Sequence, residues 1–400
     1  MIYAAVMGYG TIGSGVVKVI EGHHDYISKK TGKDIRVKYI LDLREFPGDP
    51  YADLLVHDVN VIMDDPEIDI VVETMGGTKP AYDFVKRALL AGKSVCTSNK
   101  ALVAAYGPEL LKIAEKRNAN FLFEASVGGG IPIIRPLNTC LTADKIIGIQ
   151  GILNGTTNYI LTRMEDEGLG FEEVLKDAQA LGYAEKDPTA DVDGFDSCRK
   201  IAILSSLACG KTVDYRHIYT EGIRLITSED FLYARAMGRS IKLIASMYTD
   251  GFDTHAIVAP MMVEKSDPLY SVRDVFNAIK VTGDVVDDIM FYGKGAGSLP
   301  TSSAVVADVI DAAKHIGINL KVFWNDEELQ LCGIEEQQRK FFVRVKNSAK
   351  QAAAEQFEVE EFIDAGVEDE TAFVTAPMTE MAFAAAVGSL PGVIGRIRMC

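Results

Sequence analysis

The chain has 400 residues, enough for two or three domains with large buried cores. Its net charge of −16 argues against nucleic acid and anionic membrane surfaces as partners, and 48% hydrophobic residues are typical of a globular protein. No apolar run approaches the ~20 residues of a membrane span, and the first residues lack the basic region of a signal peptide. The six cysteines form no CxxC pair, which favours a reducing, cytoplasmic location and gives no metal framework.

A glycine-rich segment lies between a predicted strand and a predicted helix at the start of the chain. Residues 2–7 are almost wholly apolar, as in a central parallel strand, and GYGTIGSG follows at 8–15. Gly8, Gly10 and Gly13 allow close approach of the backbone to a ligand, and the helix N-terminus offers N–H groups to a pyrophosphate. This context predicts dinucleotide binding, with a simple tight turn as the alternative.

The next strand raises the question of cofactor type. A predicted strand over 35–41 ends at Asp42, which can bond a ribose 2′-hydroxyl, although the interval from the glycine motif is longer than usual. Arg44 could instead bind a 2′-phosphate, so the sequence favours NAD over NADP weakly. Further predicted elements alternate as a doubly wound parallel sheet of the α/β Rossmann type requires: strands over 68–73 and 94–97, and helices over 80–91 and 107–117.

Two strand ends carry polar residues where ligands gather in such sheets, in the sequences ETMGG at 73–77 and TSNK at 97–100. Lys100 is either a solvated surface lysine or part of a site. A later strand runs into Glu124 and a loop with three glycines before Ile131-Pro132. The loop carbonyls and Glu124 are oxygen ligands of the kind that a hard cation prefers, and an inter-domain turn is the alternative.

From about residue 125 to 290 the pattern changes to that of an α+β domain, with strands expected around 240–248, 255–263 and 285–292. The sequence GILNGTTNYI at 151–160 offers small polar residues suited to hydrogen-bonding a compact polar ligand. A second glycine loop, at 293–301, precedes an apolar helix over 304–315, and it could close against a cofactor or simply start the helix.

The stretch Gly182–Lys200 is crowded with acidic residues and leads into an apolar helix that ends at Gly210. Asp193 is a plausible N-cap, and Asp196 and Lys200 then share one face of the first turns. An exposed ion pair of this kind is worth ~0.3–0.5 kcal/mol. Charges at the edge of a core, however, are unusual unless they are paired or functional, which favours a site.

The end of the chain forms a separate pattern. Residues 317–337 are polar and irregular, as in a linker, and 338–400 are expected to form a small βαββαβ-like tail. Its predicted strands include 341–346, 371–376 and 393–399. The tail offers no chemistry of its own, so we interpret it as regulatory or assembly-forming.

Over residues 1 to about 316 the chain resembles homoserine dehydrogenases. The resemblance rests on GYGTIGSG, ETMGG, SNKALV at 98–103, EASVGGGIPII at 124–134, GILNGTTNYIL at 151–161 and GYAEKDPTADVDGFDSCRKIAIL at 182–204. Members of that family interconvert L-homoserine and L-aspartate 4-semialdehyde by hydride transfer with NAD or NADP, in the biosynthesis of threonine, methionine and isoleucine.

The resemblance implies a role for each matching residue. Lys200 matches the proton donor and Lys100 matches a second catalytic lysine that also contacts the cofactor, and Asp196 is expected to act with them as a catalytic residue. The implied substrate-binding residues are Glu185, Asp191, Asp196, Tyr183, Asn154 and Thr156. The implied cofactor contacts are Gly8, Gly10, Thr11, Ile12, Gly13, Asp42, Thr74, Lys100, Gly182 and Gly297. Glu124, with backbone oxygens of Val127, Gly129 and Ile131, matches a monovalent cation site, with sodium as the expected ion.

The resemblance also implies an organisation and a homodimer. The expected domains are a dinucleotide-binding domain at 1–125, to which a helix at 300–316 returns, a substrate and dimerisation domain at 126–299, the linker at 317–337 and an ACT-like regulatory domain at 338–400. The tail departs from the usual ACT pattern, because its first turn, Asn347–Lys350, lacks an Asp-x-Pro-Gly character. Feedback by threonine is therefore an open alternative.

Two other functions remain to be weighed. An aspartate-semialdehyde dehydrogenase would use a similar cofactor domain but needs a thiolate nucleophile, and neither Cys140 nor Cys198 has a histidine nearby in sequence. A non-catalytic sensor could bind a dinucleotide and an amino acid. The intact set of Glu185, Asp196 and Lys200 argues against that reading.

Overall fold

The computed structural model describes residues 1–400, which form two compact units. Unit 1 comprises Met1–Lys145, Ala202–Asp214 and Gly293–Leu329, and unit 2 comprises Ile146–Ile201, Tyr215–Tyr292 and Gln330–Cys400. No helix is long and apolar enough to cross a bilayer.

Unit 1 is built on a six-stranded parallel sheet, as predicted. Its strands are β1 (Ile2–Met7), β2 (Ile35–Leu41), β3 (Leu55–Val56), β4 (Ile68–Glu73), β5 (Ser94–Thr97) and β6 (Phe121–Leu122). They lie in the order β3-β2-β1-β4-β5-β6, all parallel. This is the Rossmann order, and its direction reverses between β1 and β4; in sheets of this kind ligands bind beyond the carboxyl ends of the strands at that point.

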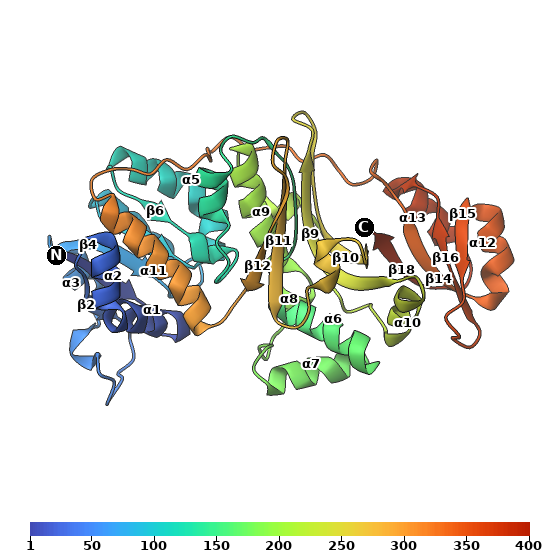
Figure 1. Ribbon diagram of the computed structural model, residues 1–400, viewed down its shortest axis with the longest axis horizontal. Helices are drawn as coiled ribbons and strands as arrows, with labels where there is room; N and C mark the ends of the chain where they lie inside the picture. Colours follow the sequence, from blue (N-terminus) through green and yellow to red (C-terminus); the bar gives the residue numbers. More distant parts are fainter. The chain divides into compact units, whose positions relative to one another are not determined.

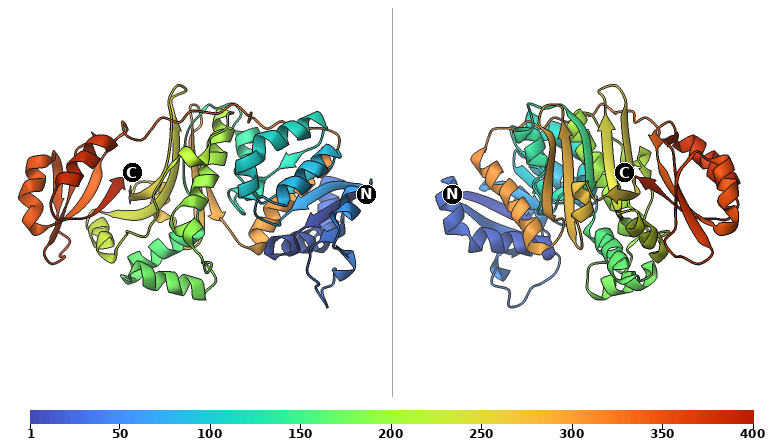
Figure 2. Two further views of the ribbon diagram at one scale, coloured as in Figure 1. Left: turned by 180° about the vertical axis from the view of Figure 1, so that it is seen from behind. Right: turned by 45° about the vertical axis from the view of Figure 1, so that its right-hand side comes forward.

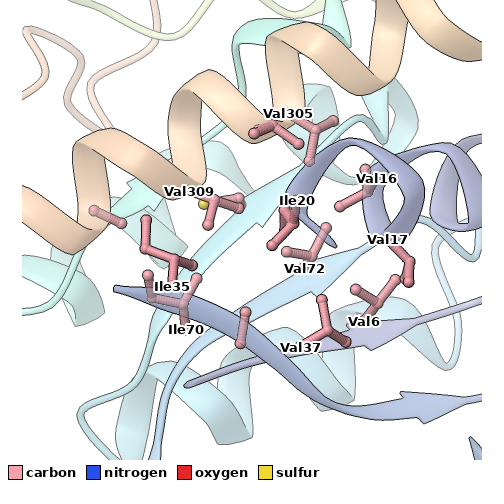
Figure 3. Packing of buried hydrophobic residues seen from close by; sticks show 14 of the residues in the cluster. Val6, Val16, Val17, Ile20, Ile35, Val37, Ile70, Val72, Val305 and Val309 are labelled. Carbon is pink, nitrogen blue, oxygen red and sulfur yellow. The ribbon is translucent and has the colours of Figure 1, made fainter. Parts of the chain in front are cut away.

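Helices cover both faces of this sheet (Figure 1). They are α1 (Thr11–Gly22), α2 (His24–Thr31), α3 (Val59–Met63), α4 (Ala81–Leu90), α5 (Lys100–Lys116) and α11 (Ser298–Lys314). On one face α1 and α11 pack against each other, and Figure 3 shows Val16 and Val305 above Val72 of β4. Helices α4 and α5 pack together on the opposite face. Strand residues are therefore buried on both sides, which explains the unbroken apolar runs in the sequence.

Two of these helices begin earlier than the sequence pattern predicts. Helix α5 starts at Lys100 rather than near 107, because the Asn99 side chain caps it by accepting the Leu102 N–H at 3.1 Å. The Gly107-Pro108 pair, which resembles a helix start, lies inside α5, where Gly107 faces the indole of Trp324. Helix α11 starts at Ser298 rather than 304.

Unit 2 is built on a mixed ten-stranded sheet. Its strands are β7 (Ile146–Ile152), β8 (Tyr219–Thr220), β9 (Arg239–Thr249), β10 (Thr254–Glu264), β11 (Phe276–Gly283), β12 (Asp287–Lys294), β14 (Phe341–Lys346), β15 (Val359–Ile363), β16 (Glu370–Thr375) and β18 (Val393–Met399). The order is β12-β11-β7-β9-β10-β18-β14-β16-β15, with β8 beside β10. The sequence pattern predicts β9, β10 and β12 approximately but not β11.

The helices of unit 2 are α6 (Gly155–Glu167), α7 (Phe171–Ala180), α8 (Thr189–Val192), α9 (Phe195–Cys209, which continues into unit 1), α10 (Ser228–Ala236), α12 (Lys350–Gln356) and α13 (Glu380–Ser389). A two-stranded sheet joins β13 (Gln338–Arg339) to β17 (Met378–Thr379). Helix α9 ends where predicted, because Gly210 follows it with a φ of +70°.

The C-terminal segment has the predicted order of elements, β14-α12-β15-β16-α13-β18. Its antiparallel strands enclose an apolar core in which the rings of Phe341 and Phe383 stack at 3.7 Å between centroids. Strand β18 also pairs in parallel with β10, where Met261 lies opposite Arg398. The red C-terminal strands therefore continue the yellow sheet of the same unit (Figure 2).

Candidate active site

The glycine-rich loop between β1 and α1 closes against the end of β4. An added Cβ at Gly13 would lie 1.9 Å from the carbonyl oxygen of Gly8, and Gly8 has a φ of +94°. The Thr74 hydroxyl donates to that same carbonyl at 2.8 Å. A Cβ at Gly10, by contrast, would meet no atom within 4 Å. The fold itself requires Gly8 and Gly13, whereas Gly10 leaves open space at the N-terminus of α1.

The start of α11 buttresses this loop from the other side. The hydroxyl of Ser298 donates to the Thr11 carbonyl at 2.7 Å, and that of Ser302 donates to the Ile12 carbonyl at 3.0 Å. Gly297, with a φ of +118°, ends the loop that leads into α11. Two hydrogen bonds from α11 therefore fix the backbone of Thr11 and Ile12. The first turn of α1 has no side-chain cap, so its N–H groups are available to bind an anion.

Asp42 and Arg44 bind each other. The Asp42 carboxylate accepts the Tyr9 N–H at 2.8 Å and the Arg44 guanidinium at 2.9 and 3.0 Å. Hydrogen bonding to Arg44 holds the pKa of Asp42 well below its usual range, so the carboxylate is ionised. The acid predicted for the ribose hydroxyl thus lies next to the glycine loop, together with the arginine predicted for a 2′-phosphate.

Glu73, at the end of β4, was not predicted as a site residue. Its carboxylate is fully buried and accepts the Thr97 hydroxyl at 2.6 Å and the Met75 N–H at 2.8 Å. Burial raises the pKa of Glu73. The Asn99 amide donates to the Gly77 carbonyl, so the loops after β4 and β5 are bonded together beside Lys100. A charged residue at the end of an apolar strand is the signal that marks Glu73 in the sequence.

The carboxylate of Glu124 accepts hydrogen bonds from the backbone of the loop that follows it. It accepts the N–H groups of Ile133, Ile134 and Arg135 at 2.6 to 2.7 Å, and it is buried. A carboxylate has about four lone-pair positions, so the role predicted for Glu124 as a cation ligand stays a prediction. The carbonyls of Val127, Gly129 and Ile131 lie at buried residues and accept none of the hydrogen bonds of the chain.

In unit 2 the chain brings Asn154, Asp191, Asp196 and Lys200 into contact. The Asn154 amide donates to Asp191 Oδ1 at 2.7 Å and to Asp196 Oδ2 at 2.9 Å. Its own oxygen caps α6 by accepting the Thr157 N–H at 2.8 Å. The cap fixes which end of the amide faces the acids, so the two N–H donors of Asn154 join the carboxylates of Asp191 and Asp196.

Lys200 lies against this cluster on the first turns of α9. Its ammonium is 2.8 Å from Asp196 Oδ2 and donates to the Leu153 carbonyl at 2.7 Å. Both side chains are buried, Asp196 at 2% and Lys200 at 8% exposure. Asp196 and Lys200, four residues apart in the sequence, therefore form a buried ion pair, in which charges interact more strongly than at a surface.

The loop before α9 carries the other predicted substrate residues. The Thr156 hydroxyl donates to the Tyr183 carbonyl at 2.6 Å, and the ring of Tyr183 contacts that of Tyr159. Glu185 is exposed, and the Gln179 amide holds its carbonyl. Gly182, exposed with a φ of +78°, follows the end of α7. The roles of Thr156, Tyr183, Glu185 and Gly182 stay predictions.

The prediction that Asp193 caps α9 is wrong. Helix α9 begins at Phe195, one residue after Gly194, whose φ is +84°. Asp193 instead follows α8, where its N–H bonds the Thr189 carbonyl and its carboxylate pairs with Arg224. A glycine in the left-handed region separates the two helices, and the sequence pattern alone did not show that break.

Two family models match most of the chain. The family model described as homoserine dehydrogenase, NAD binding domain, matches residues 8–124, and the one described as homoserine dehydrogenase matches residues 132–310. The homoserine dehydrogenase of Bacillus subtilis is 42% identical over 322 residues, which cover 80% of this chain and 74% of that protein. The chain belongs to the homoserine dehydrogenase family.

Other homoserine dehydrogenases support the assignment. That of Synechocystis is 45% identical over 313 residues, covering 76% of this chain and 72% of its own length. The crystal structure of the Thiobacillus denitrificans homoserine dehydrogenase has a TM-score of 0.90 and 34% identity, covering 100% of this chain and 98% of that one. As a homoserine dehydrogenase the chain is an oxidoreductase that interconverts L-homoserine and L-aspartate 4-semialdehyde with a nicotinamide cofactor.

Proposed function

We propose that Lys200 is the proton donor and acceptor of this reaction, and that Lys100 faces the same nicotinamide ring. The observation that carries the first part is the buried Lys200 ammonium, held between Asp196 and the Leu153 carbonyl. Those contacts fix the position of the ammonium beside the Asn154, Asp191 and Asp196 side chains.

The chemistry needs such a group. The cofactor supplies or accepts the hydride, and the protein positions the substrate beside it. Reduction of the aldehyde leaves negative charge on its oxygen, which a nearby ammonium stabilises and protonates; general acid catalysis of this kind contributes typically ~10²–10⁴-fold. Asp191, Asp196 and Glu185 hold the substrate ammonium in this proposal, with Asn154, Thr156 and Tyr183 forming the polar wall.

Substitution of Lys200 tests this role. We expect Lys200→Met to lower kcat by ~10²–10⁴-fold, the usual contribution of an acid, with the Kd for NADH within about threefold of the unsubstituted enzyme. Lys211 lies just past the end of the same helix and pairs with Glu327 at 2.6 Å, so Lys211→Met is the matched control. Near-normal turnover by Lys200→Met, with both variants folded by circular dichroism, contradicts the proposal.

We further propose that the glycine loop holds the pyrophosphate at Gly10 and the N-terminus of α1, and that NAD is preferred. The preference is supported by Asp42, whose ionised carboxylate is fixed beside the loop by the Tyr9 N–H. Initial rates with NADH and NADPH test it. If Arg44→Ala leaves the turnover with NADH unchanged and lowers the turnover with NADPH, Arg44 binds a 2′-phosphate. A preference of the unsubstituted enzyme for NADPH would overturn the assignment.

We also propose a monovalent cation, expected to be sodium, at the 124–131 loop. The support is the set of buried carbonyls of Val127, Gly129 and Ile131, because buried backbone oxygens are normally hydrogen-bonded or bound to an ion. Thermal unfolding in sodium chloride and in choline chloride at equal ionic strength tests the site. A higher Tm in sodium supports it, and equal Tm values refute it.

For the tail, we propose an ACT-like regulatory domain, on the support of its βαββαβ order and its strand order β18-β14-β16-β15. Initial rates with and without threonine test whether it senses that amino acid.

We also propose a homodimer formed through the sheet of unit 2, which exposes Tyr248, Met290 and Tyr292 on β9 and β12. Light scattering at the mass of one chain would contradict the dimer.

A further inference from the structure

We propose that Arg398, on the last strand of the chain, is a positioning residue for the substrate site, acting through Glu221. This inference rests on the proposed function, because it concerns the loop that carries Asp191 and Asp196. According to this inference, the C-terminal tail (residues 338–400) influences the substrate site even when no ligand is bound to the tail.

Arg398 is a buried guanidinium shared between two carboxylates. Its Nε and Nη2 atoms donate to Glu380 of α13 at 2.6 and 3.0 Å, and its Nη1 donates to Glu221 Oε2 at 2.6 Å. It also lies over the ring of Tyr219, whose hydroxyl donates to the same oxygen of Glu221 at 3.0 Å. The bidentate pair with Glu380 restricts the orientation of the Arg398 guanidinium. Arg398 therefore fixes the position of the Glu221 carboxylate that it binds.

Glu221 belongs to residues 219–224, which we name the clamp segment. One edge of this segment is bound to β10, where the Glu221 N–H donates to the Val258 carbonyl at 2.8 Å. The other edge lies on the substrate loop, where the Ile223 N–H donates to the Val192 carbonyl at 2.8 Å. A Cβ at Gly222 would lie 2.3 Å from that carbonyl, so the two backbones are in direct contact.

The contact continues to the acids themselves. Arg224 of the clamp segment pairs with Asp193, and Val192 and Ile223 are fully buried. Asp191 precedes Val192 and binds the Asn154 amide, which also binds Asp196. Every step from Arg398 to Asp196 is a hydrogen bond, an ion pair or an adjacent residue, so a continuous path of contacts joins Glu221 to both carboxylates. Contiguity alone is not coupling, which has to be measured.

The chain offers a matched control at a second buried arginine of the tail. Arg344 of β14 pairs with Asp230 of α10 at 2.8 Å and with Glu370 at 3.1 Å, and it is as buried as Arg398. Its other bond, at 2.7 Å, is to the hydroxyl of Thr227. Arg344 thus anchors the tail to the rest of unit 2 without touching the clamp segment.

The experiment compares Arg398→Met, Glu221→Gln and Arg344→Met in the full-length enzyme. Coupling between sites typically changes an affinity about 5–150-fold, so we expect the first two variants to raise the KM for homoserine about tenfold. Their Kd for NADH should stay within twofold, and Arg344→Met should leave the homoserine KM within twofold. The double variant Arg398→Met/Glu221→Gln should match the single variants, because both break one contact.

Several outcomes overturn the inference: an unchanged homoserine KM in Glu221→Gln, equal KM increases in the Arg398 and Arg344 variants, or multiplied effects in the double variant. If Arg398→Met does not fold, Glu221→Gln against Arg344→Met decides the question. Failure of the proposed function is distinguishable, since it would show as normal turnover in Lys200→Met whatever the clamp variants do.

Discussion

Lys242 gives a prediction of protein stability that follows directly from the structure. This lysine on β9 is fully buried, and its ammonium donates to the Val272 carbonyl at 2.7 Å. Burial lowers the pKa of Lys242 from 10.5 to about 8, an effect only partly offset by the charge of Glu165. At about 1.4 kcal/mol for each pH unit, the difference of 10.5 − 8 = 2.5 corresponds to a cost of about 3 kcal/mol.

The sign of the pH dependence follows from proton linkage. Between pH 8 and 10.5 the unfolded chain binds this proton while the folded chain releases it, so stability rises with pH across that window. Below pH 8 the full cost is present. Lys242→Met removes the cost and loses one hydrogen bond, worth about 1 kcal/mol, so we expect the variant to be more stable by about 2 kcal/mol at pH 7.

Urea unfolding at pH 7 and at pH 10 measures both parts of this prediction. Far-UV circular dichroism is the suitable signal, because the single tryptophan, Trp324, lies in unit 1. The advantage of Lys242→Met should shrink or reverse at pH 10. Lys280 on β11 of the same sheet pairs with Asp267 at 3.1 Å, so Lys280→Met should show no such gain. A Lys242→Met enzyme that is less stable at pH 7, or whose advantage does not change with pH, refutes the reasoning.

Three further predictions concern the two parts of the site. Gly13→Ala should destabilise unit 1 by at least the ~1–3 kcal/mol of overpacking, whereas Gly10→Ala should keep the Tm and raise the Kd for NADH; equal Tm losses would show that Gly10 is also structural. Asn154→Ala should raise the homoserine KM in steady-state assays by removing the donor that joins Asp191 to Asp196, and an unchanged KM would contradict that role. Glu73→Gln should cost about 1–3 kcal/mol in urea unfolding, because the NH2 end of its amide must face either the Thr97 hydroxyl or the Met75 N–H where an accepting oxygen lay; unchanged stability would count against this.

The sequence predicted those features that depend on local pattern. The apolar run of β1, the glycine loop after it and the alternation of strands and helices define the parallel sheet, because side chains buried on both faces leave a clear signal. The spacing of Asp196 and Lys200 likewise brings them together, since residues four apart on a helix are neighbours. In both cases the decisive signal is a local sequence pattern.

Other features were missed or misplaced, most of them because they depend on distant contacts. Helix α5 begins at Lys100 because of a cap by Asn99, while Gly107 and Pro108 suggested a later start. Nothing in sequence shows that Asn154 meets Asp191 and Asp196, which lie 37 and 42 residues away. The use of the Glu124 carboxylate by three N–H groups is equally invisible, because it is set by the path of the chain after the glycine turn.

The most direct test of the proposed chemistry is a crystal structure of the enzyme with a nicotinamide cofactor and homoserine bound together. The account predicts that the Lys200 ammonium lies within hydrogen-bond distance, about 3 Å, of the homoserine hydroxyl oxygen. It also predicts that the Lys100 ammonium faces the same nicotinamide ring. A complex in which another residue contacts that oxygen, with both lysine side chains directed away from the ring, would contradict it.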